Sequence, residues 1–294
     1  FRTPPSQGGG RRFESGRSYQ ELTSRPRAAL FASGECGGEA RREGVVEFLI
    51  VCPLALIAGF VDAIAGGGGL ISLPAYFFAG LPPHAAIATN KLSSTLGTLV
   101  ATVRYALFGY MVKRFVVAGV ACGLVGSAIG ANLALLADAT VLTVVMLVAL
   151  PPVAFLVFRS KNLDRFAERP LPPRLALAAT ALIALAVGVY DGFYGPGTGT
   201  ILMLLLAAVA HQDVRTAAGT TKAINLATNV AALAVFLVNG AVLIPLGLAA
   251  AAFNIAGNWL GSTFFDKKGA LILRPIMLVV IVLFAIRLVT DLLA

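Results

Sequence analysis

Apolar residues dominate the chain from residue 45 onward and form ten runs separated by short connectors. The runs cover residues 46–65, 70–81, 86–108, 115–137, 141–158, 174–192, 200–210, 217–239, 242–264 and 270–293. The second and seventh runs are short, whereas crossing the hydrocarbon core of a bilayer takes about 20 helical residues. Each short run is therefore expected to form a hairpin or a broken helix with the run before it. The pattern predicts an all-α polytopic membrane protein with about 8–10 membrane segments.

The chain contains one five-segment unit twice. Residues 59–70 (GFVDAIAGGGGL) return as residues 188–199 (GVYDGFYGPGTG) at a shift of 129 residues (188 − 59). Lys91 and Lys222 align at a shift of 131 (222 − 91), so a two-residue insertion (131 − 129) separates the two blocks. In each half the glycine-rich stretch comes directly before the short second segment. Such a break, repeated once per half, is typical of the substrate sites of secondary transporters.

Composition and charge agree with a membrane protein. Of the 294 residues, 58% are hydrophobic and only 13% are charged. A soluble domain would carry roughly twice that share of charge. The net charge of +9 comes mostly from a basic tail and from short connectors, and no nucleic-acid motif accompanies it. We therefore expect the lipid bilayer, and no nucleic acid, as a partner of this chain, and we interpret the basic residues as markers of orientation.

The sequence divides into four regions. Residues 1–44 are rich in Gly, Ser, Pro and Arg and are predicted to be a disordered tail. Residues 45–160 form the first membrane repeat, residues 161–173 a basic cytoplasmic linker, and residues 174–294 the second membrane repeat. Basic residues in the linker and in the connectors before the fourth and eighth runs place these segments on one side. That arrangement predicts inverted repeats, and two parallel four-span halves are the alternative.

Four ionisable residues within the apolar runs form two repeat-related pairs, Asp62 with Asp191 and Lys91 with Lys222. Ionisable groups are costly in a bilayer, so function is their first interpretation. Two ammonium groups facing one cavity repel each other unless an anion lies between them, which predicts an anionic substrate. The aspartates precede the glycine turns and either bind free N–H groups of the turns or carry a coupled proton.

We expect one anion to bind near the midplane between the two glycine turns. Glycines allow backbone N–H groups to approach the anion, and the short helices that follow direct their positive dipole ends toward it. The predicted substrate-binding residues are Lys91, Lys222, Asn90, Thr221, Ser94, Asn225, Gly67, Gly68 and Gly197, with Asp62 and Asp191 in coupling or turn support. Alternating access would arise from one half rocking against the other, and a passive anion channel is the alternative function.

No catalytic, metal-binding or cofactor residues are predicted, and we do not expect an enzyme. His84 and His211 lie in connectors, and the glycine run lacks the Gly-Lys-Ser/Thr ending of a nucleotide-binding loop. Two Gly-xxx-Gly pairs, at residues 126–130 and 257–261, predict close helix packing inside the fold. A homodimer contact at these pairs is left open.

The glycine motif at residues 59–74, followed by Gly-Leu-Pro at 80–82 and Ala-Thr-Asn-Lys at 88–91, resembles the sulfite exporter TauE/SafE family. Thr-Thr-Lys at 220–222 is the counterpart in the second half, and the resemblance covers residues 45–294. It implies a permease of the bacterial inner membrane, like the 4-toluene sulfonate uptake permeases. Such a permease would move sulfite, sulfonates or related small organic anions by a proton-linked secondary mechanism.

The second half departs from the first, because Pro196 interrupts its glycines and Thr221 stands where the first half has Asn90. The two half-sites are therefore not expected to be equivalent. The identity of the anion, the direction of transport and the coupling ion stay open at this point.

Overall fold

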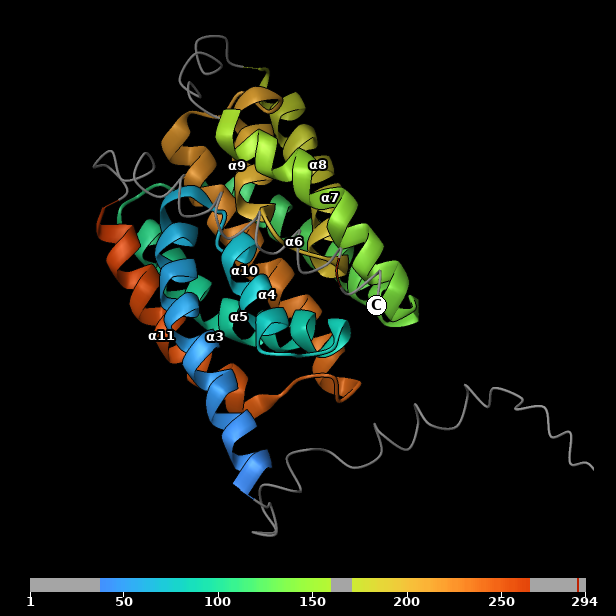
Figure 1. The fold of residues 1–294 in the computed structure, drawn as a ribbon. Helices are drawn as coiled ribbons and strands as arrows, with labels where there is room; N and C mark the ends of the chain where they lie inside the picture. The colour runs from blue at the N-terminus through green and yellow to red at the C-terminus, as the bar shows by residue number, and fades with distance from the viewer. Residues whose placement is uncertain (1–37, 160–170, 265–289, 291–294) are drawn as a thin grey trace, which may run out of the picture. The chain divides into compact units, whose positions relative to one another are not determined.

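The computed structural model describes residues 38–159, 171–264 and 290, and these residues form nine α-helices with no β-strand among them. The first half contains α3 (Gly38–Ala65), α4 (Gly69–Phe78), α5 (Pro83–Leu107), α6 (Lys113–Leu136) and α7 (Ala139–Arg159) (Figure 1). The second half contains α8 (Pro173–Phe193), α9 (Thr198–Ala208), α10 (Val214–Val238) and α11 (Ile244–Thr263). The predicted all-α fold is confirmed. Nearly all of the tenth run and most of the tail and of the basic linker lie outside the described residues.

The helix bounds repeat the duplication found in the sequence. Helices α5 and α10 each have 25 residues and are offset by 131 residues at both ends (214 − 83 and 238 − 107). The short helices α4 and α9 begin 129 residues apart (198 − 69). Proline at the first position of α5 and α8 starts these helices, because proline already has a helical φ and needs no N–H partner there.

Among the residues that the structure describes, four helical segments are long and apolar enough to cross a membrane, namely Val45–Ala65 of α3 and helices α6, α8 and α10. Helices α4 and α9 are shorter, as the sequence predicts, and residues 70–77 of α4 are buried within the protein. A short apolar helix of this kind is stable at membrane depth because protein, rather than lipid, surrounds its ends.

The first helix extends into the region that the sequence assigns to the tail. Helix α3 begins at Gly38, so residues 38–44 are helical, whereas a compact unit begins at Val45. The segment EARRE at 39–43 consists of good helix formers and continues the apolar helix toward the N-terminus without needing apolar residues of its own.

Each half of residues 45–264 packs mainly on the other half. Helix α6 lies beside α8, and α11 lies beside α3 (Figure 1). A Cβ atom added to Gly126 of α6 would lie 2.3 Å from the carbonyl oxygen of Leu185 in α8. The repeat-related helices α11 and α3 pack equally closely, because a Cβ on Gly257 of α11 would lie 2.1 Å from the carbonyl oxygen of Leu56 in α3. The predicted packing role of the Gly-xxx-Gly pairs inside the fold is therefore confirmed.

Equivalent helices of the two halves run in opposite directions. The Thr102 hydroxyl near the end of α5 donates to the carbonyl oxygen of Lys222 (3.1 Å), in the first half of α10. Lys91, near the start of α5, donates from Nζ to Oδ1 of Asn229 (3.0 Å), which lies further along α10. Residues nearer the start of α5 thus contact residues nearer the end of α10. The two helices are antiparallel, as inverted repeats require.

Other helices of opposite halves are parallel. Gly219 of α10 packs against Tyr110, just before α6, and further along both helices the Ser127 hydroxyl donates to the carbonyl oxygen of Thr228 (2.6 Å). Helix α8 follows the same direction as α6, because Gly119 lies near Thr180 and Gly130 near Phe193. Helices α6, α8 and α10 therefore all begin at one end of the bundle, and α5 ends there.

This shared end collects the cations that lie outside the interior. Within residues 45–158 and 171–264, every Lys or Arg other than the two interior lysines lies there, namely Arg104, Lys113, Arg114, Arg174 and Arg215. Arg104 also lies over the Trp259 ring, 4.4 Å from its centroid. The inverted arrangement thus brings together the connectors that the sequence assigns to one side of the membrane.

Candidate functional site

The two glycine-rich turns meet in the interior of the protein. A Cβ atom on Gly199 would lie 2.6 Å from Cα of Gly66, and one on Gly69 would lie 2.9 Å from Cα of Pro196. The Thr200 hydroxyl donates to the carbonyl oxygen of Ala65 (2.6 Å), which ties the start of α9 to the end of α3. Only residues without a Cβ allow the two backbones to approach this closely. The approach of the two turns that the sequence predicts is therefore present.

Two buried ion pairs connect the halves beside these turns. Lys91 Nζ lies 2.8 Å from Oδ2 of Asp191, and Lys222 Nζ lies 2.9 Å from Oδ2 of Asp62. The pairs are repeat-related, and each joins a lysine of one half to an aspartate of the other. The sequence predicts that a bound anion balances the charges of the lysines. Instead, each ammonium group has a carboxylate partner, which reduces the cost of burying its charge.

The two ion pairs have different surroundings. Asp191 Oδ1 also accepts a hydrogen bond from the Thr198 hydroxyl (2.7 Å), so this carboxylate supports its turn through a side chain. Lys91 has a second acceptor in Asn229, whereas Lys222 donates to the backbone carbonyl of Asp62. The side chain of Asp191 is 2% exposed and that of Asp62 is 13% exposed.

Sequence differences between the halves explain this asymmetry. The first-half counterpart of Thr198 is Gly69 (198 − 129), which has no hydroxyl to donate. The first-half counterpart of Asn229 is Thr98 (229 − 131), whose shorter side chain is not bonded to Lys222. Thr198 and Asn229, which differ from their first-half counterparts, thus give the Lys91–Asp191 ion pair additional hydrogen bonds.

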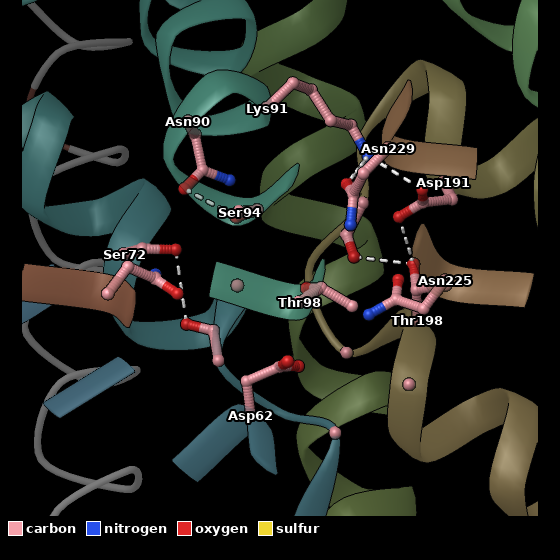
Figure 2. A pocket seen from close by; sticks show the side chains of 17 residues that line it. Asp62, Ser72, Asn90, Lys91, Ser94, Thr98, Asp191, Thr198, Asn225 and Asn229 are labelled. Carbon is pink, nitrogen blue, oxygen red and sulfur yellow. Dashed lines mark hydrogen bonds and ion pairs between the residues drawn. The ribbon is translucent and has the colours of Figure 1, made fainter. Parts of the chain in front are cut away.

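A polar cavity lies between the glycine turns and the lysine-bearing helices (Figure 2). The volume open to the centres of water molecules is about 30 Å³, which gives room for roughly two waters. The polar side chains that line it are the amides of Asn90, Asn225, Asn229 and Asn254, the hydroxyls of Ser72, Ser94, Thr98 and Thr198, and the charged groups of Lys91, Asp62 and Asp191. Figure 2 shows Lys91 and Asp191 on one side of the cavity and Asp62 on another.

Most of the predicted site residues line this cavity. They are Lys91, Asn90, Ser94, Asn225, Gly68 and Gly197, together with Asp62 and Asp191. Lys222 and Thr221 instead line a second, smaller cavity of about 10 Å³ beside Tyr105 and Met203. Gly67 lies in the first turn outside the lining of both cavities, and its carbonyl oxygen accepts from the N–H of Leu70 (3.1 Å).

Several lining residues were not selected from the sequence. They are Ser72, Thr98, Thr198, Asn229 and Asn254. Each is a polar residue inside or next to an apolar run, and this property alone could have identified Asn229, one helical turn after Asn225, and Asn254. Over residues 38–159, 171–264 and 290, no group of three His, Cys, Asp or Glu side chains could hold a metal ion.

The short helices also contribute to the cavity. Helix α4 begins at Gly69 and α9 begins at Thr198, and both of these residues line it. The first turn of a helix carries a partial positive charge, although the N–H groups of Leu70 in α4 and Thr198 in α9 are already bonded to carbonyl oxygens of the preceding turns. Two helix N-termini therefore direct positive potential into one small polar space, as the sequence predicts.

The fold combines inverted repeats, two short helices that each follow a glycine-rich turn, and a polar cavity with paired charges where the turns meet. These features are typical of a membrane transporter. The model of the family described as sulfite exporter TauE/SafE matches residues 51–288. The chain belongs to this family.

Curated relatives carry transporter names. A probable membrane transporter protein, ORF9, of Sinorhizobium sp. is 36% identical over 247 residues, covering 84% of this chain and 93% of its own. The probable membrane transporter protein YfcA of Escherichia coli K12 is 32% identical, covering 81% and 88%. A probable membrane transporter protein of Haemophilus influenzae is 30% identical, covering 84% and 96%. No solved structure matches the chain.

Proposed function

We propose that this protein is a secondary transporter of small anions of the sulfite and sulfonate type. The cavity between the two glycine turns is its substrate site, and the halves move by alternating access around it. The main support is that two inverted repeats meet at one polar cavity whose lining includes two helix N-termini and a lysine. The family description, sulfite exporter, supports an anion that contains an oxidised sulfur atom.

The lining of the cavity suits an oxoanion. Four asparagine amides can each donate hydrogen bonds, and the Lys91 ammonium and the starts of α4 and α9 add positive charge. The oxygens of a sulfite or sulfonate group would accept from these donors in place of water. The small volume favours an anion of few heavy atoms over an aromatic sulfonate.

Carrier behaviour is favoured over passive conduction. Inverted repeats that contact each other at a central site are the usual basis of alternating access. The direct contact of the turns at Gly66 and Gly199, and the ion pairs beside it, leave only a small cavity rather than a wide path. A carrier of this kind saturates with substrate, whereas a channel carries current that rises nearly linearly with the driving force.

We further propose that the protein lies in a bacterial cytoplasmic membrane with its cationic end inside. Arg104, Lys113, Arg114, Arg174 and Arg215 gather at this end, and cytoplasmic connectors of membrane proteins carry an excess of Lys and Arg. The relatives from Sinorhizobium, Haemophilus and Escherichia support a bacterial membrane.

The proposal is tested with purified protein. Thermal unfolding is measured with sulfite, sulfate, thiosulfate, methanesulfonate and acetate, and each stabilising anion is then tested for exchange in proteoliposomes. Lys91→Met should abolish both stabilisation and exchange, because it removes the ammonium group that lines the cavity. Lys113→Met removes an exposed cation at the end of the bundle and serves as the matched control, with both properties intact. Failure of every anion to stabilise the protein or to exchange would end this proposal.

A further inference from the structure

We propose that Asp62 binds the proton that couples to anion movement, whereas the repeat-related Asp191 holds the site together by keeping its pair with Lys91. This inference rests on the proposed anion transport and assigns its coupling ion and the residue that carries it. Three observations support it: the charge balance of the ion pairs, the different surroundings of the two aspartates, and the groups that face Asp62.

The charge balance creates the need for a proton. Lys91 with Asp191 and Lys222 with Asp62 contribute two positive and two negative charges, so the four groups sum to zero. An anion entering this buried region would leave it with one uncompensated negative charge, which is costly away from water. One proton taken up by a carboxylate restores neutrality. The pairing found in the structure therefore makes proton uptake the natural companion of anion binding.

The surroundings select Asp62 over Asp191. Asp191 is 2% exposed and is bonded to both Lys91 and the Thr198 hydroxyl, so protonation would disrupt two buried interactions. Asp62 is 13% exposed and its carboxylate is bonded to Lys222. It also lines the polar cavity, so a proton can reach it along the route that water and the anion use.

The contact between Lys222 and Asp62 allows this change. Lys222 donates to the backbone carbonyl of Asp62 as well as to its carboxylate. When the carboxylate takes up a proton from the aqueous phase, the ammonium stays charged and keeps the carbonyl as its acceptor. The positive charge of Lys222 then loses its carboxylate partner and is balanced by the anion in the neighbouring cavity.

The other titratable groups near Asp62 are accounted for. Lys222 approaches it from α10, and Lys91 of α5 and Asp191 of α8 line the same cavity. Tyr105 of α5 donates its hydroxyl to the carbonyl oxygen of Ala63 (2.8 Å). The side chains of α4, α9 and α11 that line the cavity are Ser72, Thr198 and Asn254, none of which titrates. Asp62 is thus the carboxylate of the lining that is free to change protonation without breaking the Lys91 pair.

The test uses the full chain in proteoliposomes that contain a pH-sensitive dye. Methanesulfonate is the first probe because its single negative charge does not change with pH, and sulfite is the second. For the wild-type protein, we expect one proton to enter with each methanesulfonate ion, and an inward proton gradient to drive uphill uptake. Asp62→Asn should abolish proton entry and uphill uptake, and should make the remaining anion exchange independent of pH.

Three further variants make the outcome specific. Asp62→Glu keeps a titratable group and should restore proton entry. Asp191→Asn should lose exchange as well as uphill uptake, because Lys91 is left without its carboxylate. Asp138→Asn neutralises an exposed carboxylate between α6 and α7 and should behave as wild type.

Two results separate this inference from the proposed function. If wild-type protein takes up methanesulfonate or sulfite in net uptake without proton entry, or if Asp62→Asn retains proton-driven uptake, the assignment of Asp62 is wrong and the transporter proposal stands. If wild-type protein exchanges neither anion, the proposed function fails and this inference fails with it.

Discussion

The most specific prediction concerns the stability that the Lys91–Asp191 ion pair contributes. Replacing Lys91 by Met removes the ammonium but keeps an unbranched side chain of similar length. The Asp191 carboxylate is then buried with only the Thr198 hydroxyl as a side-chain partner. Leaving one partner of a buried ion pair uncompensated costs about 3–5 kcal/mol. We expect Lys91→Met and Asp191→Asn each to lower the free energy of unfolding by an amount in this range.

The double variant, Lys91→Met with Asp191→Asn, should recover part of the loss. Neither remaining side chain is charged, so no buried charge is left unpaired. Residues in direct contact show coupling free energies of up to about 3 kcal/mol, and this pair should lie near the upper end because both side chains are at most 3% exposed. The variants are compared by denaturant-induced unfolding in mixed micelles, with the same detergent fraction throughout.

The Lys222–Asp62 pair provides an internal comparison. Asp62 is 13% exposed and adjoins a cavity with room for roughly two waters, so its carboxylate can regain hydration when Lys222→Met removes its partner. The expected loss is about 1–3 kcal/mol, the usual cost of an unsatisfied polar group. Equal losses for the two lysine variants, or additive effects of Lys91→Met and Asp191→Asn within about 0.5 kcal/mol, would refute the reasoning.

Three other predictions follow from the described helices. Gly130→Ala should lower the free energy of unfolding by about 1–3 kcal/mol or more in the same assay, because its Cβ would lie 2.0 Å from a backbone carbonyl oxygen of α8. A Cβ on Gly123 of the same helix would lie 3.2 Å from two methyl groups and 3.9 Å from a backbone carbonyl oxygen, so Gly123→Ala should lower the free energy of unfolding by less than half as much. In a cysteine-free background, a membrane-impermeant thiol reagent added to intact cells should label Asn239→Cys and spare Arg215→Cys, since these exposed positions lie at opposite ends of α10; the reverse pattern would contradict the orientation. Asp213→Ala should lower stability at neutral pH by about 1 kcal/mol through loss of the α10 N-cap. Partial burial raises the pKa of Asp213, but hydrogen bonds from the first turn of α10 outweigh it, so the net pKa is lowered. The cap therefore contributes stability above the pKa of the unfolded chain, and this contribution disappears as the pH falls through the lower pKa of the folded chain. Asp213→Asn should keep most of the stability and lose its pH dependence, and an unchanged pH profile would contradict this.

Local patterns along the chain were sufficient for the helices and for the duplication. The bounds of α5 and α10 reproduce the 131-residue shift because an internal copy repeats the same apolar periods, although α5 starts at a proline and α10 starts after the N-cap Asp213. The glycine turns could also be predicted from the sequence, since a glycine run inside an apolar segment has few other roles. The family resemblance follows from the same short motifs, and the family match confirms it.

The position of each predicted site residue was harder to infer. Lys91 and Lys222 were expected to face one cavity, yet only Lys91 lines the polar cavity, and Lys222 lines a smaller one next to it. Repeat symmetry places the lysines at equivalent positions but does not say whether their heads meet. That depends on how α5 and α10 cross, which no pattern within either helix encodes.

By itself, the sequence determined which segments are helical, where the helices break, and which few polar groups are placed among apolar residues. Those properties depend on residues close together in the chain. The tertiary structure decided that Lys91 pairs with Asp191, 100 residues away, and that Lys222 pairs with Asp62, 160 residues away. An ion pair forms between whichever side chains the packing of helices brings together, and here that packing joins each lysine to the carboxylate of the opposite half.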